Sequence, residues 1–260
     1  MSLQFDVSTT DKVNVGSLGD YDPDGHTFFL WYYLSGLSNV RFLAAKAQAA
    51  SPFDQATYGH IRANGQLRFD YRGTTNLDYR TATGFLTTGS WQFIAIAFDL
   101  TGSAGSRCLM WHGDLTTKAI AYTSWATATD GSGYSTAFHD EPLILGNRDT
   151  VEAEAPAGSI AYAAVFPSIL TLAEVQALQY RPGLWCIKNP LGFWDLGLNG
   201  TTNVPDLSGN GYTGTTTGVA LDTHVPLRQP WFMGGEFIPS AIVAGDTAGL
   251  RTLSLMGVGI

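Results

Sequence analysis

Charged residues are scarce in this sequence. Asp, Glu, Lys and Arg make up 14% of its 260 residues, against about 25% in an average domain. No run of basic residues is present, and the net charge is −8. Nucleic-acid binding needs clustered Lys and Arg, which displace the counterions of the phosphates. The sequence therefore excludes a nucleic-acid partner, and we expect its acidity to support solubility.

Cysteines and long apolar runs are also few. The two cysteines, Cys108 and Cys186, are too few for a disulfide framework, and their spacing fits no metal site. Cys108 lies in an apolar segment, which predicts a buried thiol. The first residues, MSLQFDVSTTD, have neither a basic nor an apolar region, so we expect no signal peptide. No apolar stretch of about 18 residues predicts a membrane-spanning helix, so we expect no membrane partner.

Common catalytic motifs are missing as well. The sequence has no Gly-x-Ser-x-Gly, no His-Glu-x-x-His and no array of Cys and His. Its five histidines are scattered along the chain. These absences favour a protein that is not an enzyme.

The residues that are abundant are typical of a β protein with many turns. Hydrophobic residues make up 45% of the chain, aromatic residues 12%, and there are 30 glycines. Turn signals separate segments that are apolar or that alternate between apolar and polar residues. This regular spacing predicts a sandwich of two antiparallel sheets. The predicted strands and hairpins are residues 26–34, 40–47, 58–73, 90–100, 106–115, 141–149 and 158–168.

Two of these segments carry local predictions. In residues 58–73, the pair Asn64-Gly65 predicts a hairpin turn of type I′, with Tyr58, His60 and Arg62 alternating along one flank. The segment 106–115 is predicted to end in a His-Gly-Asp turn.

One helix is predicted over residues 170–180. Thr171 is its expected N-cap, and Glu174 three residues later completes a capping box. Leu172, Val175 and Leu178 form one apolar stripe, which must pack on the sandwich because the helix is too short to be stable alone.

The chain changes character after residue 183. Residues 184–220 contain short strand-like pieces, and residues 221–260 resemble an arm with an apolar end. We therefore expect a sandwich over 1–183, a short β extension over 184–220 and a C-terminal arm and tail over 221–260. The apolar end is expected to dock on this chain or on a neighbour, because an exposed one would promote aggregation.

The order of the segments resembles the laminin-G-like, concanavalin A-like lectin and glucanase jelly-roll family. GSWQFIA (89–95) is similar to the family's central strand, and GSIAYAAV followed by LTLAEV (158–175) to its closing strand and helix. The similarity covers about residues 3–180. It implies an all-β, two-sheet antiparallel jelly-roll sandwich with one short helix, extended here by a β extension and an arm.

The stretch from Trp194 to Gly218 resembles the opening strands of such modules, although it follows the helix. It either begins a truncated second module or folds as a β extension against this sandwich or another chain. We favour the extension, because no further strands follow.

The resemblance suggests glycoside hydrolysis as the first enzymatic activity to consider. This reaction needs two carboxylates in one cleft. Glucanase relatives carry them on one strand as Glu-x-Asp-x-x-Glu, and this sequence has no such strand. Asp149, Glu152 and Glu154 lie in a Pro/Ala-rich segment in another order, and we interpret them as a solvated loop.

Sugar binding needs an aromatic face flanked by planar polar groups. The long loop after Met110-Trp111, expected to be irregular, offers Trp125, Tyr134 and His139, and Trp111 at the end of the preceding strand is a further candidate. The alternative is that its aromatic side chains pack the loop onto the sheet.

No cofactor is expected, although calcium is left open. Asp206, Ser208 and Asn210 carry alternating oxygen ligands, and Asp130 and Asp140 flank the long loop. The same Asp-Leu-Ser-Gly-Asn-Gly pattern also makes a good turn, which is the favoured interpretation.

The lectin-like fold, the missing leader and the arm together favour a virion protein. We expect a bacteriophage capsid-decoration or tail-associated jelly roll, made in the host cytoplasm, that forms homo-oligomers and contacts other virion proteins. The alternative is a carbohydrate-binding module for a surface glycan. The residues expected to mediate assembly are Trp231, Phe232, Phe237, Leu253, Leu255 and Met256.

Overall fold

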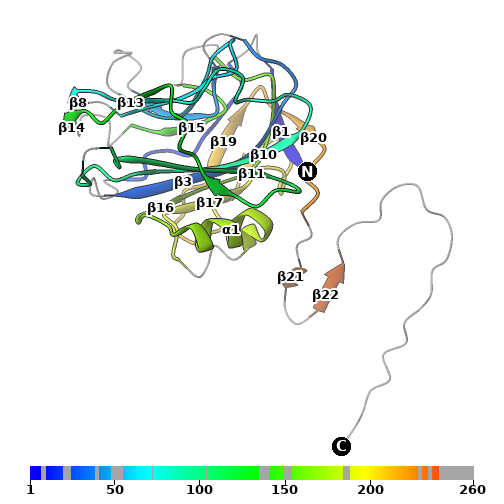
Figure 1. The fold of residues 1–260 in the computed structure, drawn as a ribbon. Helices are drawn as coiled ribbons and strands as arrows, with labels where there is room; N and C mark the ends of the chain where they lie inside the picture. The colour runs from blue at the N-terminus through cyan, green and yellow to red at the C-terminus, as the bar shows by residue number, and fades with distance from the viewer. Residues whose placement is uncertain are drawn as a thin grey trace, which may run out of the picture. The chain divides into compact units, whose positions relative to one another are not determined.

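The computed structural model describes residues 1–6, 10–19, 25–38, 41–47, 55–71, 73–103, 105–134, 141–148, 154–183, 188–227, 230–233 and 236–239. Nearly all of the regular elements in these residues are strands, and most of them belong to two large antiparallel sheets. The sheets stack as the two layers of a sandwich (Figure 1). The predicted all-β jelly-roll sandwich with one short helix is therefore confirmed.

Sheet A contains eight of the described strands, in the order β12-β11-β10-β3-β16-β1-β20, and β17 also pairs with β16. Its central strands are long and almost wholly buried. The bounds are β1 (Ser2–Phe5), β3 (His26–Leu34), β10 (Trp91–Phe98), β11 (Cys108–Asp114), β12 (Ile120–Ala121), β16 (Gly158–Phe166), β17 (Gly192–Asp195) and β20 (Ala220–Asp222).

Sheet B contains ten of the described strands, in the order β13-β9-β7-β6-β5-β15-β2-β19-β18, and β4 also pairs with β6. The bounds are β2 (Lys12–Asn14), β4 (Arg41–Phe42), β5 (Ala44–Ala47), β6 (Gln55–Ile61), β7 (Leu67–Tyr71), β9 (Leu77–Arg80), β13 (Thr127–Thr129), β15 (Leu143–Leu145), β18 (Asn203–Val204) and β19 (Gly214–Thr217).

Two small strand pairs complete the described structure. β8 (Gly73–Thr75) pairs with β14 (Ser132–Tyr134), and β21 (Pro230–Met233) pairs with β22 (Glu236–Pro239). The chain forms two compact units, residues 1–227 and residues 228–260. Among the described helices, none has the length and apolar character to cross a membrane.

The central strands of sheet A bury side chains on both faces. In β3, Phe28, Leu30 and Tyr32 belong to the cluster between the two sheets. Phe29 and Trp31 belong to a second cluster on the opposite face, together with residues of the helix α1 (Leu172–Tyr180). Figure 1 shows α1 against this outer face of sheet A. Cys108 is buried in the first cluster, as its apolar segment predicts.

The helix has the predicted capping box. The Glu174 amide donates to Thr171 Oγ1, and the Thr171 amide donates to a Glu174 carboxylate oxygen at 2.8 Å. Val175 and Leu178 are buried as predicted, but Leu172 is 40% exposed. The prediction for Leu172 is therefore wrong. The first turn of the helix projects beyond the apolar cluster, and Gln179 is buried at the other end instead.

Gln179 connects α1 to sheet A by hydrogen bonds. Its backbone carbonyl accepts the indole N–H of Trp31 at 2.9 Å. Its side-chain oxygen accepts the Ala119 amide at 2.6 Å, and its side-chain nitrogen donates to the carbonyls of Asp114 and Thr117. Because the polar atoms of the Gln179 side chain all have hydrogen-bond partners, its burial leaves no unpaired donor or acceptor.

The segment after the helix completes both sheets. β17 and β20 are strands of sheet A, and β18 and β19 are strands of sheet B. The Trp194–Gly218 stretch therefore folds on its own chain. Of the two predicted boundaries, at 183 and at 220, neither coincides with the end of the first compact unit, which runs to Leu227.

Three local predictions differ from the structure. The β6–β7 turn is not type I′, because only Gly65 of the central pair has a positive φ, +74°. The Gly65 amide donates to the Arg62 carbonyl at 2.9 Å, which makes a three-residue loop. β11 continues past His112 to Asp114, whose carboxylate caps the following turn. The long loop 123–141, predicted to be irregular, contains the short strands β13 and β14.

Candidate functional site

Charged side chains project from the outer face of sheet B, the face that points away from sheet A. In β7 and β9, apolar residues alternate with charged ones, and the apolar residues lie in the core between the sheets. The alternation therefore turns Arg68 and Asp70 of β7, and Asp78 and Arg80 of β9, outward. The strand register pairs Arg68 with Arg80 and Asp70 with Asp78.

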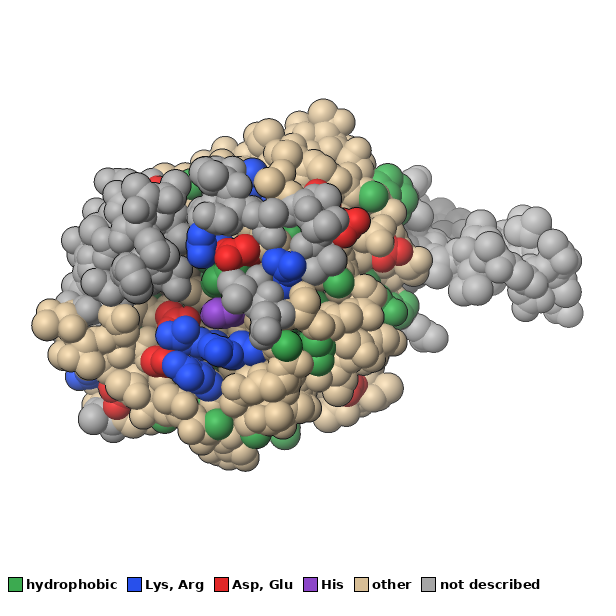
Figure 2. All heavy atoms as spheres, turned by 90° about the horizontal axis from the view of Figure 1, so that it is seen from above, with side chains coloured by type: hydrophobic (Ala, Val, Ile, Leu, Met, Phe, Trp, Pro, Cys, Tyr) green, Lys and Arg blue, Asp and Glu red, His purple; other side chains and the backbone are tan. Residues whose placement is uncertain are grey.

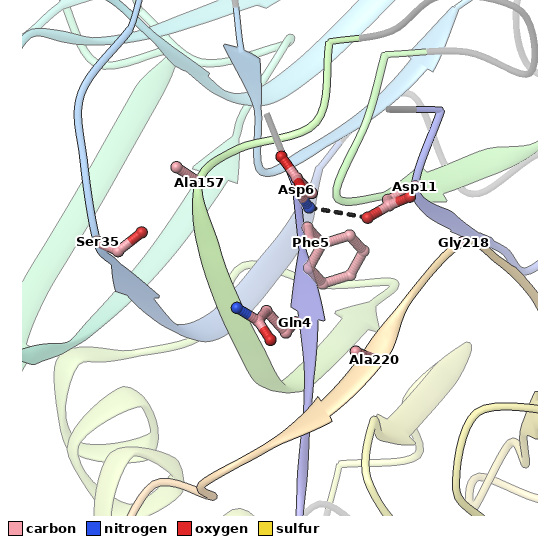
Figure 3. Close-up of a pocket in the computed structure, with 8 residues that line it drawn as sticks. All are labelled: Gln4, Phe5, Asp6, Asp11, Ser35, Ala157, Gly218 and Ala220. Atoms are coloured by element: carbon pink, nitrogen blue, oxygen red, sulfur yellow. Dashed lines mark hydrogen bonds between the residues drawn. The ribbon is translucent and has the colours of Figure 1, made fainter. Parts of the chain in front are cut away.

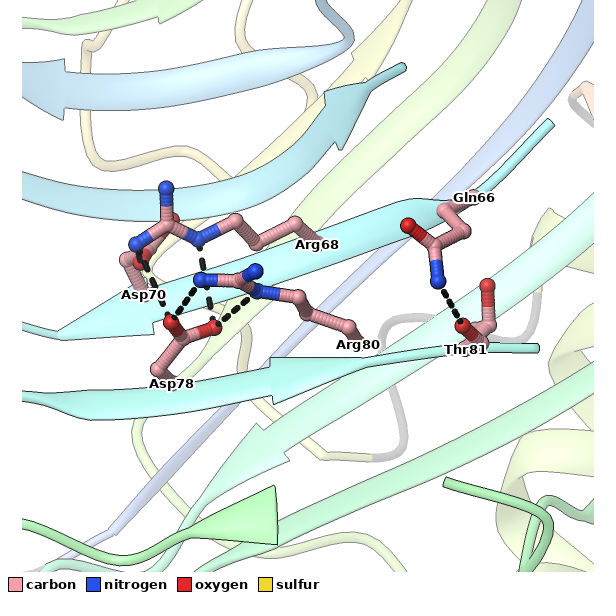
Figure 4. Close-up of polar contacts among 6 residues, drawn as sticks. All are labelled: Gln66, Arg68, Asp70, Asp78, Arg80 and Thr81. Carbon is pink, nitrogen blue, oxygen red and sulfur yellow. Dashed lines mark hydrogen bonds and ion pairs between the residues drawn. The ribbon is translucent and has the colours of Figure 1, made fainter. Parts of the chain in front are cut away.

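Asp78 is the centre of an ion-pair network (Figure 4). It accepts Arg80 Nε at 3.0 Å and Arg80 Nη2 at 2.5 Å. It also accepts Arg68 Nε and Nη2, both at 3.2 Å. Arg68 Nη2 lies 2.5 Å from an oxygen of Asp70. One carboxylate thus holds two guanidinium groups side by side.

A β-bulge in β6 adds two more polar side chains to this face. The register shifts between Thr57 and His60, so that Thr57 pairs with Asp70 and His60 pairs with Arg68. Gly59 lies within the bulge at φ +143°, which a glycine accommodates. Tyr58 lies in the core. The predicted alternation of Tyr58 and His60 on one flank is therefore wrong, because the bulge reverses the facing.

The imidazole of His60 lies flat on a neighbouring ring. The His60 and Phe42 rings stack with centroids 4.6 Å apart and an interplanar angle of 22°. This contact fixes the plane of the imidazole. We call the outward-facing set of side chains the charged face: Thr57, His60, Arg68, Asp70, Asp78 and Arg80.

Three buried atoms of the charged face have no hydrogen-bond partner in the part of the chain that the structure describes. They are Thr57 Oγ1, His60 Nε2 and Asp70 Oδ2. Thr57 is 0% exposed, Asp70 5% and His60 9%. Buried polar atoms are nearly always paired in native proteins, so an unpaired cluster calls for an explanation such as a binding role.

Burial changes the ionisation of this cluster. It raises the pKa of Asp70 to about 7, and it does so despite the opposing attraction of Arg68. Burial also lowers the pKa of His60 to about 4, and four nearby arginines reinforce this effect. The hydrogen bonds and charges of Arg80 and Arg68 lower the pKa of Asp78 although burial acts against them. At neutral pH, His60 is therefore neutral and Asp78 is ionised.

Basic side chains surround the charged face. Arg62, Arg68, Arg80 and Arg148 all act on His60 electrostatically. Figure 2 shows Lys and Arg side chains gathered with a histidine on the face seen from above. Arg148 is itself paired with Glu154, its Nε lying 3.3 Å from a carboxylate oxygen. This is a concentration of positive charge on a protein whose net charge is −8.

The donors and acceptors of the charged face suit hydroxyl ligands. A neutral imidazole carries one donor and one acceptor, and a threonine hydroxyl is both. A carboxyl group with a pKa near neutrality either accepts or donates. Sugar hydroxyls have the same dual character, so the face can pair with several of them.

Two of the aromatic residues predicted to bind sugar, Trp111 and Trp125, lie in different apolar clusters. Trp111 is 7% exposed and lies in the cluster beneath α1. Trp125 is half-buried against the core between the sheets, and its ring is nearly perpendicular to those of Phe69, Tyr79 and Tyr122. These edge-to-face contacts pack the Trp125 ring at the edge of the sandwich. This agrees with the alternative interpretation, in which the aromatic side chains of the loop pack onto the sheet.

The other two predicted sugar-binding residues are less defined. Tyr134 ends β14, which pairs with β8. His139 lies outside the described residues, as does Asp140. Asp130 contacts the Tyr79 hydroxyl and the Gly105 amide.

The predicted calcium ligands form a turn. Asp206 accepts the amides of Phe193, Ser208 and Tyr212 at 2.9–3.1 Å and the Ser208 hydroxyl at 2.8 Å. Asn210 donates its side-chain N–H groups to the carbonyls of Pro190 and Leu191, both at 3.0 Å. A cation needs oxygen lone pairs, and those of Asp206 already accept protein donors. These hydrogen bonds hold the turn at residues 206–210 against β17 and the two residues before it.

The other acidic groups of the described residues are not gathered as metal ligands. No group of three or more His, Cys, Asp or Glu is placed to hold a metal ion among the described residues. Glu154 pairs with Arg148, whereas Asp149 and Glu152 lie outside the described residues.

One pocket of about 420 Å³ lies beside β1 and β20, away from the charged face (Figure 3). Its acidic side chains are Asp6 and Asp11, and the Asp11 carboxylate accepts the Asp6 amide at 2.8 Å. Its one aromatic side chain, Phe5, is buried and offers no platform for a ligand.

The predicted assembly residues lie in the second compact unit. Trp231 and Phe232 belong to β21 and Phe237 to β22, and the register pairs Phe232 with Phe237. Leu253, Leu255 and Met256 lie outside the described residues.

The charged face was not predicted as a site, although the sequence contains a signal for it. Arg68, Asp70, Asp78 and Arg80 alternate with apolar residues in LRFDY and LDYR. In a chain with 14% charged residues, such a concentration on two neighbouring strands marks one face of the sheet.

Comparisons with known proteins show the fold. No protein-family model matches the sequence, and no curated protein matches it. A proposed carbohydrate-binding protein from Bacteroides ovatus is similar in structure, with a TM-score of 0.55 and 14% identity. The similarity covers 86% of this chain and 59% of that one, so the chain spans less than two thirds of that protein.

Two further solved structures are more distant. The CBM40 domain of a Ruminococcus gnavus IT-sialidase, bound to α2,3-sialyllactose, has a TM-score of 0.45 and 13% identity, with 68% of this chain and 97% of that one covered. The enzymatically active domain of tailspike protein 2 from bacteriophage CBA120 has a TM-score of 0.47 and 16% identity, with 69% and 27% covered.

Proposed function

We propose that this chain is a glycan-binding module without enzymatic activity, and that its ligand lies on the charged face. The observation that carries the proposal is the cluster of unpaired buried atoms on Thr57, His60 and Asp70. An unpaired buried polar atom costs about 1–3 kcal/mol. A ligand that supplies hydrogen-bond partners to this cluster therefore gains affinity from them.

The setting of the cluster supports the proposal. It lies on a sheet, and rigid elements hold binding groups more accurately than loops do. Arg68 and Arg80 beside it are 24% and 32% exposed, so a ligand can reach them. The fold is also that of the proposed carbohydrate-binding protein from Bacteroides ovatus, which supports the proposal by analogy alone.

The test is a glycan array with the full chain, followed by calorimetry on the ligands found. Thr57→Val is the informative variant. It keeps the branched shape of the side chain and removes a buried hydroxyl that has no partner. Its stability should therefore equal or exceed that of the wild type, while its glycan affinity should fall at least fivefold.

Two further variants locate the site. Arg181→Gln changes an exposed arginine at the end of α1, away from the charged face, and should bind as the wild type does. Trp125→Ala tests the loop site predicted from the sequence. Loss of binding in Trp125→Ala alone, with Thr57→Val unchanged, would move the site to the loop. Absence of binding to every glycan on the array would contradict the function.

A virion role with assembly through residues 221–260 stays a prediction from the sequence, as does its location in the virion. In the arm, the structure describes the hairpin β21–β22, whose strands carry three of the predicted assembly residues.

A further inference from the structure

We propose that the glycan bound by the charged face is acidic, and that the guanidinium groups of Arg62, Arg68 and Arg80 bind its carboxylate or sulfate group. This inference rests on the proposed function and names the class of ligand. Its starting point is that these arginines keep N–H donors to which no described residue is paired.

Within the described residues, the ion-pair network leaves one nitrogen of each paired arginine without a polar contact. Arg80 contacts Asp78 through Nε and Nη2, and Arg68 contacts its two carboxylates through the same pair of atoms. Figure 4 shows the remaining nitrogen, Nη1, of each guanidinium turned away from Asp78. Each Nη1 carries two N–H donors. Arg68 and Arg80 are cross-strand partners on one face of the sheet, an arrangement in which two guanidinium groups can bind one oxyanion.

Arg62 adds a third guanidinium group near the network. It lies in the β6–β7 loop and acts on His60 electrostatically. Among the described residues, its side chain has no hydrogen bond or ion pair, and it is partly exposed. In the part of the chain that the structure describes, the carboxylates near these three arginines therefore do not neutralise all of their positive charge.

The charges of the site support this conclusion. Arg62, Arg68 and Arg80 face one firmly ionised carboxylate, Asp78. The second carboxylate, Asp70, is largely protonated below neutral pH because burial raises its pKa to about 7. Glu154 is already engaged with Arg148. Among the described residues, three guanidinium groups therefore face one ionised carboxylate and one that is partly protonated near neutral pH, which leaves an excess of positive charge.

Asp78 has a positioning role in this arrangement. It holds Arg68 and Arg80 in fixed orientations, so little side-chain entropy is lost when a ligand binds. A guanidinium fork binds both carboxylates and sulfates in two-pronged contacts. The site therefore recognises the oxyanion, and the buried Thr57 hydroxyl and His60 imidazole can pair with the sugar ring beside it through bound water.

The test compares three forms of one oligosaccharide on the full chain by calorimetry: the uronic acid form, the carboxyl-reduced neutral form, and the neutral form carrying sulfate. We expect one of the two acidic forms to bind at least tenfold more tightly than the neutral form. The form that binds more tightly distinguishes a carboxylate site from a sulfate site. Added salt should weaken the acidic form and leave the neutral form unchanged.

Arginine variants assign the preference to the site. Arg80→Gln and Arg62→Gln should each reduce the affinity for the acidic form at least fivefold and leave the neutral form nearly unchanged. Arg80→Lys keeps the charge but loses the fork, so it should restore only part of the affinity. Arg181→Gln is the matched control and should bind like the wild type, and thermal unfolding verifies that each variant is folded.

The outcomes separate this inference from the proposed function. Equal affinity for acidic and neutral forms, both weakened by Thr57→Val, would overturn the acidic ligand and retain the glycan site. An acidic preference weakened equally by Arg181→Gln would reduce it to general charge attraction and overturn the inference. Absence of binding to all three forms and to the array would overturn both.

Discussion

The two outer faces of the sandwich are opposite in chemistry. On sheet A, the outward side chains are apolar, Phe29, Trp31 and Phe93 among them, and they are buried beneath α1 and the segment ending at Leu227. On sheet B, the outward side chains include those of the charged face, and Arg68 and Arg80 remain partly exposed. One face is thus covered and contributes to stability, and the other stays partly exposed, where we propose that a ligand binds.

The burial patterns of the strands show the same difference between the two sheets. All nine residues of β16 are buried, because both of its faces are covered. In β9, buried and half-buried residues alternate, because one face points into the core and the other outward. Continuous apolar strands indicate a doubly covered sheet, and alternating strands indicate an open face.

The largest effect is expected on the covered face. Trp31 is fully buried and donates its indole N–H to α1. Trp31→Ala should lower the free energy of unfolding by about 3–5 kcal/mol, measured by urea denaturation. Leu172→Ala, on the exposed side of the same helix, should change it by less than about 0.5 kcal/mol. Equal effects of the two variants would mean that α1 does not seal this face.

The second effect concerns the pH dependence of the charged face. Burial raises the pKa of Asp70 from 3.8 to about 7, so folding favours its protonated form. The stability from this group is fully present below pH 4 and is lost as the pH rises through 7. Asn does not titrate, so Asp70→Asn should gain stability relative to the wild type over this range, by at most about 4 kcal/mol.

The measurement for Asp70 is urea denaturation of both proteins at several pH values from 4 to 8. The lowered pKa of His60 acts in the opposite direction, destabilising the fold as the pH falls below 6.5. It is present in both proteins and largely cancels in the difference. A stability difference that stays constant with pH would show that Asp70 is ionised throughout.

Local signals predicted much of the fold. The capping box at Thr171 and Glu174 and the strand over 26–34 depend on neighbouring residues, so the sequence contains them. The bulge at Gly59 and the three-residue loop at Gly65 are different, because pairing with β7 determines which residues face the core. The predicted sandwich boundary at 183 rested on a local change of composition. Such a change does not reveal that strands beyond it pair with both sheets.

The site was harder to predict for a related reason. Aromatic residues such as Trp111 are conspicuous in the sequence, but the helix covers that side chain. The charged face depends on three strands and a bulge that bring Thr57, His60 and Arg80 together. Only the alternation of charged and apolar residues in β7 and β9 marks it in advance.

A smaller effect tests the helix that covers sheet A. Thr171→Ala removes the cap of α1 and should lower the free energy of unfolding by about 1 kcal/mol. Thr171→Ser keeps the hydroxyl and should change it by a few tenths at most, about 0.3 kcal/mol. Glycan binding on the opposite face should be unchanged in both. A large loss of stability in the serine variant would point to packing of the threonine methyl group rather than to the cap.

The smallest effect is expected from removal of the arm. Val225 is buried in the cluster beneath α1, Leu227 packs against that cluster, and the first compact unit ends at Leu227. A chain that ends at Leu227 should unfold within about 0.5 kcal/mol of the full chain. A chain that ends at Asp222 loses both side chains from the covered face and should be less stable by about 2 kcal/mol or more.

Light scattering on the same two chains tests the assembly prediction. If residues 228–260 mediate assembly, the chain ending at Leu227 should be monomeric and the full chain oligomeric, at equal stability. Glycan binding should survive this truncation, because the charged face lies wholly within residues 1–227. If the truncation weakens glycan binding, the ligand site includes the arm, and the contrast between a covered face and an independent binding face fails.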